Sequence, residues 1–347
     1  MNRRRFLRTA APVFAAGALS ACGAVPVSRR RVVYASAFSL PKSVDEALWL
    51  DFESRSEREL PDFDVRLLIR GETGPEEQTF ASLRRNRVQI AGGSFAGVAT
   101  LVPEIALLSA PFLFDSADEV DFVMDRYMLE PFRALFAAQG LFLLQWTEVG
   151  WVHLYGKRMI RLPEQARGQR VRASSSIASQ AFVREIGADT ITMPFSDVVP
   201  SLQTGLIDAG VTSVTMYALS GVATEAPNYV LTQHSYDMGV LLANLRWLDA
   251  LPAAAKTLFS KGFGGAAVTR RRAREAVAQL TATLPAKGVR VLNLAPGERA
   301  HWREVAWPSH QKLIRRIGGG AQRIYDLMLD GKRAFSASRR ASPQAAG

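Results

Sequence analysis

An arginine on a short predicted strand is the strongest candidate for a binding residue in this chain. Arg172 lies in the sequence Arg-Val-Arg-Ala-Ser at residues 170–174, and Phe195 follows the next extended segment. A guanidinium group is planar and can hold a carboxylate through two parallel hydrogen bonds. On residue type alone, a solvated surface arginine is the better interpretation. The aromatic neighbour favours a site for a small organic anion, with Phe195 either as a pocket wall or as ordinary core.

The elements around this arginine are predicted to alternate between strands and helices. A strand over 170–172 leads to a helix that ends at Gly187. An extended piece over 189–195 leads to a second helix that begins at Ser196 and ends at Gly205. Glycine and serine at such junctions are typical of βαβ units. Open α/β sheets bind ligands beside the carboxyl ends of their strands, so this stretch is expected to carry the site.

The first part of the chain is predicted to form a doubly wound β-α-β-α-β unit. Strands are expected at 31–38, 63–69 and 88–92, with helices at about 43–60 and 76–85 between them. Alternation of this kind is typical of a parallel sheet with helices on its faces.

Two longer extended segments, 141–155 and 229–245, are predicted to pass between two lobes. Double crossing is characteristic of periplasmic binding proteins, so the expected fold class is α/β, two-lobed, with a hinge and a ligand cleft between the lobes. The predicted domains are a leader at 1–22, lobe I at 31–149 plus 239–277, lobe II at 150–238 plus 278–333, and a disordered tail at 334–347.

The stretch from 168 to 208 closely resembles the DctP-type substrate-binding proteins of TRAP transporters. The family's carboxylate-binding strand appears here as residues 170–174, and its following helix pattern as Met-Pro-Phe-Ser-Asp-Val at 193–198 and Leu-Gln-Thr-Gly at 202–205. The resemblance covers most of the chain between residues 31 and 330. It implies that Arg172 binds the ligand carboxylate, with no cofactor or ATP. It also implies that the partners are a small organic acid and the membrane subunits of a TRAP permease.

Further ligand-binding residues are implied by their places in the family pattern. Val152 and Thr212 stand where many relatives carry an arginine and an asparagine, and Met216 lies nearby. Without that cation and amide, a second carboxylate or a sugar hydroxyl lacks its partners. The ligand is therefore expected to be a monoanion with a largely apolar body. Ser94 and Phe95 end a strand of the first lobe and are expected to face the cleft from the other side, with turn chemistry as the alternative.

The N-terminus indicates export from the cytoplasm. Residues 3–8 are Arg-Arg-Arg-Phe-Leu-Arg, and an apolar run over 9–21 precedes Cys22, the only cysteine. This run is shorter than the ~20 residues of a membrane-spanning helix. Small residues before Cys22 resemble a bacterial lipobox, so Cys22 is expected to carry lipid and anchor the protein in the periplasm. An ordinary secretory signal is the alternative, and the export route is either twin-arginine or Sec.

The composition is that of an ordinary globular protein large enough for two lobes. The chain has 347 residues, of which 48% are hydrophobic and 22% are charged. Its net charge is +11, which could steer anions. Export argues against a nucleic-acid partner, and no finger-like motif occurs in the sequence. The basic run at 270–274 is expected to be the solvated face of a helix. The mature protein is expected to be a monomer.

Catalytic and metal-binding motifs are not indicated. The four histidines are not in an H-E-x-x-H pattern, so no metal site is expected. Ser94 lies among glycines, but the frame is not G-x-S-x-G. The chain is therefore expected not to be an enzyme. Two alternatives stay open: a binding protein that serves a sensor kinase and, less favoured, an envelope hydrolase on an α/β fold.

Overall fold

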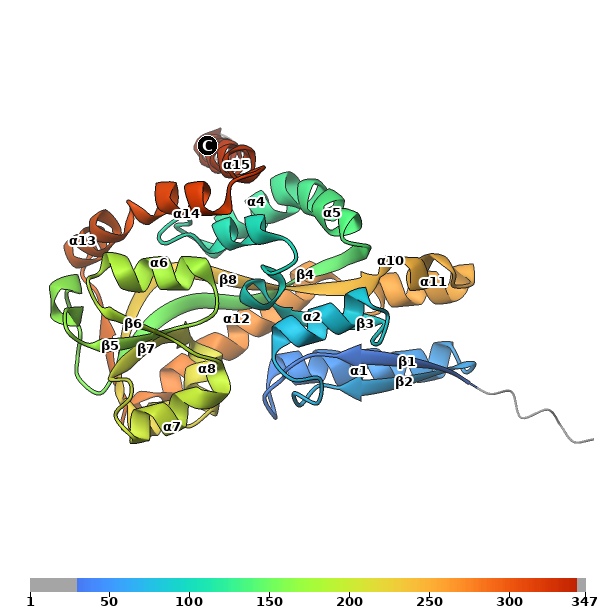
Figure 1. Ribbon diagram of the computed structural model, residues 1–347, viewed down its shortest axis with the longest axis horizontal. Coiled ribbons are helices and arrows are strands. Elements are labelled where there is room, and N and C mark those ends of the chain that lie inside the picture. Colours follow the sequence, from blue (N-terminus) through green and yellow to red (C-terminus); the bar gives the residue numbers. More distant parts are fainter. Residues whose placement is uncertain (1–29, 342–347) are drawn as a thin grey trace, which may run out of the picture.

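The structure is a computed structural model that describes residues 30–341. The predicted leader at 1–22, including the predicted lipid site Cys22, lies outside the described residues, and so do residues 342–347. Within the described part of the chain, one sheet of nine strands runs through the whole molecule (Figure 1). Its order is β2-β1-β3-β8-β4-β7-β5-β6, with β9 beside β8. The strands are β1 (Arg31–Ser36), β2 (Phe63–Leu68), β3 (Ile90–Ser94), β4 (Leu141–Gly156), β5 (Arg170–Ala173), β6 (Asp189–Thr192), β7 (Ala209–Ser213), β8 (Asn228–Asn244) and β9 (Arg290–Asn293).

The first lobe contains the β-α-β-α-β unit expected from the sequence. β1 pairs in parallel with both β2 and β3, and α1 (Val44–Glu59) and α2 (Glu76–Arg84) connect these strands. α1 begins where the sequence indicated, because the Ser43 hydroxyl accepts a hydrogen bond from the Glu46 amide at 3.1 Å. Parallel strands turn their carboxyl ends toward the same edge, and that edge faces the second lobe (Figure 1).

The second lobe repeats this plan with β5, β6 and β7, which are parallel to one another. The connecting elements are α6 (Ile177–Glu185), a 3-10 turn (Phe195–Asp197), α7 (Val198–Gln203), α8 (Val214–Leu219) and α9 (Val222–Glu225). The predicted capping role of Ser196 is wrong. Ser196 lies inside the 3-10 turn, and its hydroxyl contacts the neighbouring Asp197 carboxylate at 3.0 Å.

The strands β4 and β8 cross between the lobes and pair with each other along their lengths. The 239–243 part of β8 pairs with β3 in lobe I, and the 152–156 part of β4 pairs with β7 in lobe II. The β4–β8 register shifts between Glu148 and Gly150, and Gly150 has a φ of 94°. Such a break lets two paired strands bend. Gly150 stands next to the lobe boundary expected after residue 149, which stays a prediction.

The remaining helices pack around the sheet, and the last of them, α15, differs from the sequence prediction in its packing and in its length. The remaining helices before β4 are α3 (Phe95–Val98), α4 (Ala117–Val123) and α5 (Leu129–Ala138). Those after β8 are α10 (Leu245–Asp249), α11 (Ala253–Lys261), α12 (Ala266–Thr283), α13 (Pro296–Ala306), α14 (Ser309–Ile317) and α15 (Ala321–Ala341). α15 was assigned to lobe II up to residue 333 but packs against α4 of lobe I. The predicted disordered tail at 334–347 is wrong for residues 334–341, which continue α15. An apolar contact helps to hold them, because the Phe335 ring lies 5.6 Å from that of Phe122.

The basic run on α12 is solvated, as the sequence indicated, only at Arg271 and Arg272, whereas Arg270 and Arg274 form ion pairs with lobe I and the strand crossing. The Arg270 side chain is 2% exposed and binds Asp121 at 3.0 Å and Asp125 at 2.8 Å. Arg274 binds Asp121 at 2.8 Å and Glu148 at 3.2 Å. α12 runs along both lobes (Figure 1), and these ion pairs join its first half to lobe I.

Candidate functional site

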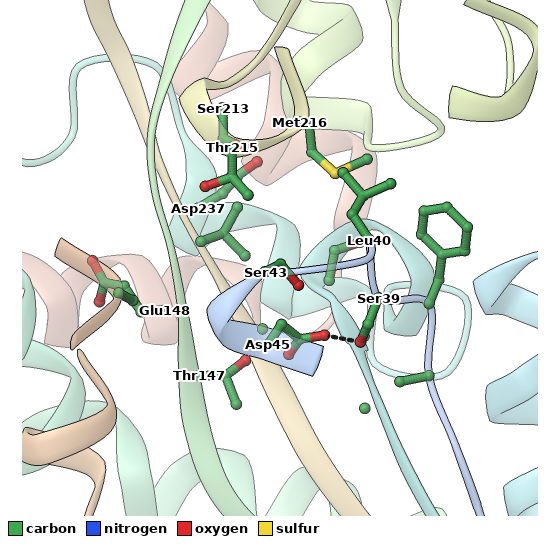
Figure 2. A pocket seen from close by; sticks show the side chains of 18 of the residues that line it. Ser39, Leu40, Ser43, Asp45, Thr147, Glu148, Ser213, Thr215, Met216 and Asp237 are labelled. Carbon is green, nitrogen blue, oxygen red and sulfur yellow. Dashed lines mark hydrogen bonds between the residues drawn. The ribbon is translucent and has the colours of Figure 1, made fainter. Parts of the chain in front are cut away.

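A cleft of about 1480 Å³ lies between the lobes. It is lined by the ends of β1 and β3 with the start of α1 from lobe I, by β5, β7 and α8 from lobe II, and by the crossing strands. Figure 2 shows Ser213, Thr215 and Met216 on one side of it and Ser39, Ser43 and Asp45 on the other. Pockets for small ligands usually enclose about 300–1,000 Å³, so this cleft has room to narrow around a ligand.

Arg172 lies on the lobe II wall of the cleft and is only 5% exposed. β5 carries it, and its guanidinium donates hydrogen bonds to the carbonyl of Met193 at 3.0 Å and that of Val211 at 3.4 Å. Within the described residues it forms no ion pair with a carboxylate. Burial therefore lowers the pKa of Arg172, although an arginine stays charged at neutral pH. The site holds a desolvated positive charge without a counter-ion.

The backbone beside Arg172 is shaped so that another side chain can approach it. Gly210 is the β7 partner of Arg172, and a Cβ atom at Gly210 would lie only 2.2 Å from the Tyr155 hydroxyl. A glycine is therefore required there. The Tyr155 hydroxyl is buried without a hydrogen-bond partner, and burial raises its pKa. Tyr155 stays neutral and does not compensate the charge of Arg172.

The other residues predicted for lobe II also lie along the cleft. Phe195 presents its ring to the Arg172 guanidinium at 5.6 Å, a cation–π contact. Val152, Thr212 and Met216 line the same wall. Ser213, which was not predicted, is 3% exposed, and its hydroxyl has no hydrogen-bond partner in the structure. This wall combines one cation, apolar surface and a free hydroxyl.

The two residues predicted from lobe I have different surroundings. Ser94 lines the cleft, but its hydroxyl is bonded to Glu76 and accepts from the Gly97 amide at 3.3 Å, as a cap of α3. Phe95 is not part of the lining. Its ring is buried and packs edge-to-face on Trp146 at 5.8 Å, so its contacts are those of core. The hydrogen bonds of Ser94 are those expected from the alternative interpretation, in which this residue stabilises a turn.

Carboxyl groups line the cleft from lobe I and from the crossing strand β8, which the expectation of a largely apolar ligand did not anticipate. Asp45 accepts from Ser39 and Asp237 accepts from Ser235 at 3.3 Å, while Glu76 accepts from Ser94. Asp45 is an exposed residue on the open cleft. Desolvation raises the pKa of Asp45, and likewise raises the pKa of Glu76 and that of Asp237.

A polar contact and an ion-pair network flank the cleft. The Ser175 hydroxyl of lobe II donates to Glu77 of lobe I at 2.8 Å, so the lobes touch across the opening. At the strand crossing, Glu148 is 2% exposed and bound by Arg274 and by the Tyr236 hydroxyl. These contacts help to fix the position of one lobe relative to the other. The charge of Glu148 at the strand crossing is already compensated by Arg274.

The histidine near the cleft makes contacts typical of a structural residue. The His234 ring stacks on Phe182 at 3.7 Å, and its Nδ1 lies 2.8 Å from the Thr232 hydroxyl. Burial keeps the pKa of His234 well below its ordinary value, so the ring is neutral. No group of three or more histidine, cysteine or carboxylate side chains placed to hold a metal ion occurs within residues 30–341.

Sequence reasoning missed the acidic side chains of the site. Asp45 and Glu76 looked like ordinary first-turn residues of helices, where acids are common. A usable signal existed, because both lie at the starts of the helices that follow the carboxyl ends of predicted strands. Asp237 and Ser213 lie within or at the end of strands and gave no local sign of facing a cleft.

The chain was compared with protein families and with known proteins. The model of "Bacterial extracellular solute-binding protein, family 7" (DctP) matches residues 50–316. A solute-binding protein of Verminephrobacter eiseniae is 26% identical over 233 residues, 67% of this chain and 70% of that protein. The C4-dicarboxylate-binding periplasmic protein DctP of Vibrio cholerae is 24% identical over 251 residues, 70% of this chain and 74% of that protein.

Solved structures share the fold. The sugar acid binding protein DctPAm of Advenella mimigardefordensis, in complex with galactonate, matches with a TM-score of 0.80 and 23% identity over 88% of this chain and 99% of that one. A TRAP periplasmic solute-binding protein of Shewanella oneidensis, with bound succinate, matches with a TM-score of 0.81 and 18% identity over 87% of this chain and 99% of that one. The predicted two-lobed α/β fold class is confirmed. No helix between residues 30 and 341 combines the length and the hydropathy needed to cross a membrane.

Proposed function

We propose, from the premise that the chain belongs to family 7 of the bacterial extracellular solute-binding proteins (DctP), that Arg172 is the residue with which it captures its ligand. The protein is the periplasmic receptor of a TRAP transporter and takes up a small organic anion for a membrane permease. The family and the fold are those of binding receptors rather than enzymes. The two alternatives, a sensor-kinase receptor and an envelope hydrolase, receive no support.

One observation supports the role of Arg172 above the others. Its guanidinium is buried at the cleft, and its hydrogen bonds go to neutral carbonyls. A buried charge without a counter-ion is costly, and a carboxylate entering the cleft would offset that cost. The same argument does not apply to Arg70, which lines the cleft but is bound to Glu46.

The rest of the site follows from the surroundings of this charge. Phe195, Val152, Thr212 and Met216 would form the wall along which the ligand lies, and Ser94 would support Glu76 from lobe I. The segments of β4 and β8 near residues 149 and 238 would act as the hinge, with α12 as a connecting strut. Closure of the lobes would then exclude water and strengthen the pairing with Arg172.

The N-terminal part of the proposal concerns residues outside the described range. Cys22 would carry lipid after cleavage of the leader, and the mature protein would be a monomer on the membrane surface. The mass of the membrane-extracted protein tests this directly. A diacylated or triacylated cysteine at the mature N-terminus is expected, and an unmodified N-terminus elsewhere would contradict it.

The ligand role is tested by titration of the purified mature domain. Mass spectrometry first identifies the molecule that co-purifies, and calorimetry then measures its affinity for wild type and for Arg172→Ala. A loss of at least tenfold is expected, equivalent to ~1.4 kcal/mol. The control is Arg55→Ala, on the lobe I side of the same cleft. Equal affinity of wild type and Arg172→Ala would reject the proposed role.

A further inference from the structure

Carboxyl groups from lobe I and from the crossing strand β8 form an acidic wall of the cleft, and within residues 30–341 no cation pairs with them. Asp45 comes from the first turn of α1, Glu76 from the first turn of α2, and Asp237 from β8, and all three line the cleft. Burial is the main cause of the raised pKa of Glu76, and the charges of Glu77 and Asp45 add to it. Figure 2 shows Asp45 and Asp237 in the same view of the pocket.

The cations of this wall are engaged elsewhere or stay apart. Within residues 30–341, no lysine, arginine or histidine forms an ion pair with any of the three carboxyl groups. Arg70 is bound to Glu46 and donates to the Ser39 carbonyl at 2.9 Å. Lys42 and Arg55 also line the cleft without reaching these carboxyl groups. The hydrogen bonds that the carboxyl groups receive come from neutral serine groups.

The lobe II wall carries a positive charge without a partner. Among the residues that the structure describes, Arg172 has no carboxylate partner, and the buried Ser213 hydroxyl has no hydrogen-bond partner. The cleft is therefore positive at one wall and negative at the other. Closing it around a ligand would desolvate both sets of charges, and each would then cost free energy unless the ligand carried the matching charge.

Ligands of different charge meet these two walls differently. A dicarboxylate would satisfy Arg172 and bring its second carboxylate toward the acidic wall. A hydroxy acid would donate hydrogen bonds there but leave the negative charge in place. A molecule with a carboxylate and a positively charged nitrogen compensates both walls at once.

Resting on the proposed carboxylate role of Arg172, we propose that the ligand is a zwitterion. Its carboxylate binds at Arg172, and its positively charged nitrogen binds at the wall formed by Asp45, Glu76 and Asp237. The apolar surface of Val152, Phe195 and Met216 contacts the carbon skeleton between the two charges. The largely apolar monoanion expected from the sequence is thereby replaced by a molecule with a charged group at each wall.

The test is calorimetric titration with ligands matched in length. One set is γ-aminobutyrate, γ-hydroxybutyrate and succinate, and a second set has one more carbon: δ-aminovalerate, δ-hydroxyvalerate and glutarate. Protein amino acids, betaines and glucuronate complete the panel. At the better-fitting length, the amino member is expected to bind at least tenfold tighter than the hydroxy member, with the dicarboxylate weakest. An α-amino acid or a betaine as the tightest ligand of the panel also supports the proposal.

The acidic wall is then tested by isosteric variants. Asp45→Asn, Glu76→Gln and Asp237→Asn are each expected to weaken the zwitterion about tenfold, while the hydroxy acid is unaffected or binds better. Glu275→Gln is the matched control, because Glu275 also lines the cleft from α12. Thermal melts of all four variants show whether each one is folded before its affinity is compared.

The two proposals fail in different ways. If glucuronate, a hydroxy acid or a dicarboxylate binds at least as tightly as any zwitterion and depends on Arg172, the zwitterion proposal is overturned and the carboxylate role stands. If ligands bind but Arg172→Ala changes nothing, the carboxylate role itself is rejected. Failure of every zwitterion in the panel to bind also overturns the zwitterion proposal.

Discussion

Two buried arginines lie in different regions of this molecule with opposite electrostatic surroundings. Arg270, on α12, binds the carboxylates of Asp121 and Asp125. Arg172, on β5, contacts carbonyl oxygens and an aromatic ring. Burial alone would lower the pKa of Arg270, but the hydrogen bonds and charges of its aspartates outweigh burial and raise it. Burial lowers the pKa of Arg172, and no carboxylate opposes the effect.

The difference separates a structural arginine from one that awaits a ligand. The charge of Arg270 is compensated within the folded chain, so it can contribute to stability in the absence of ligand. The charge of Arg172 is not compensated, so its removal should affect binding far more than folding. Burial and residue type are the same in both places, and only the partners differ.

The largest expected contrast is between the methionine variants of these two arginines. Arg270→Met should lower the free energy of unfolding by about 3 kcal/mol, because it leaves Asp125 without its cation and removes one of the two arginines that bind Asp121. Arg172→Met should change the stability of the ligand-free protein by no more than about 1 kcal/mol, since it removes hydrogen bonds but also a desolvated charge. Urea unfolding of both variants measures the difference.

Arg271→Met is the control for this comparison, because Arg271 is an exposed neighbour on the same helix. Its unfolding curve should match that of wild type. A loss of stability in Arg172→Met as large as that in Arg270→Met would remove the distinction between the two arginines.

Replacement of each arginine by lysine sharpens the comparison at smaller magnitude. Arg172→Lys keeps the charge and loses the planar fork, so ligand affinity should fall about tenfold, or ~1.4 kcal/mol. Arg270→Lys should leave ligand affinity unchanged. Calorimetry with the co-purifying ligand gives both values, and an equal loss of affinity in Arg270→Lys would show that the loss in Arg172→Lys is not specific to a ligand contact.

The uncompensated carboxyl groups of the cleft should respond to pH. Burial raises the pKa of Asp237 above its ordinary value of 3.8, so the folded state binds more protons than the unfolded state between these two values. The stability contributed by this group is complete below the ordinary value and is lost as pH rises through the raised pKa. Asp237→Asn should therefore stabilise the ligand-free protein at neutral pH by about 1 kcal/mol.

Thermal melts across pH check this sign. The advantage of Asp237→Asn over wild type should shrink as the solution is acidified. Asp115 offers the opposite case: burial works against it, but Arg303 and Lys332 lower its pKa. Asp115→Asn should consequently lose stability at neutral pH. A growing advantage of Asp237→Asn on acidification would contradict the assignment.

The smallest effect is expected at the contact across the cleft opening. Ser175→Ala removes the 2.8 Å hydrogen bond to Glu77, and ligand dissociation should become modestly faster, by about 0.5–1 kcal/mol in barrier. Ser196→Ala is the control, because Ser196 is also exposed at the cleft but contacts only its neighbour Asp197. Stopped-flow dissociation rates that are the same for both variants would show that the Ser175 contact does not hold the lobes together.

Much of the fold could be predicted from the chain because its signals are local. Ser43 begins α1 through a hydrogen bond to a residue three positions away, and glycines with positive φ end several helices. The alternation of strands and helices, together with the family pattern around Arg172, placed this arginine on a strand of the second lobe. The end of α15 was missed because residues 334–341 are held by tertiary contacts such as that of Phe335.

The charge balance of the site could not be predicted in the same way. The sequence by itself determined that Arg172 lies on a strand and that Phe195 follows the next extended segment, since hydrophobic periodicity and turn residues act over a few positions. The tertiary structure alone decided which arginine has partners, because Arg270 and Asp121 are 149 residues apart. It also brought Asp45, Glu76 and Asp237 from three separate elements to one cleft. Compensation of charge depends on distance through space, and the folded chain sets that distance.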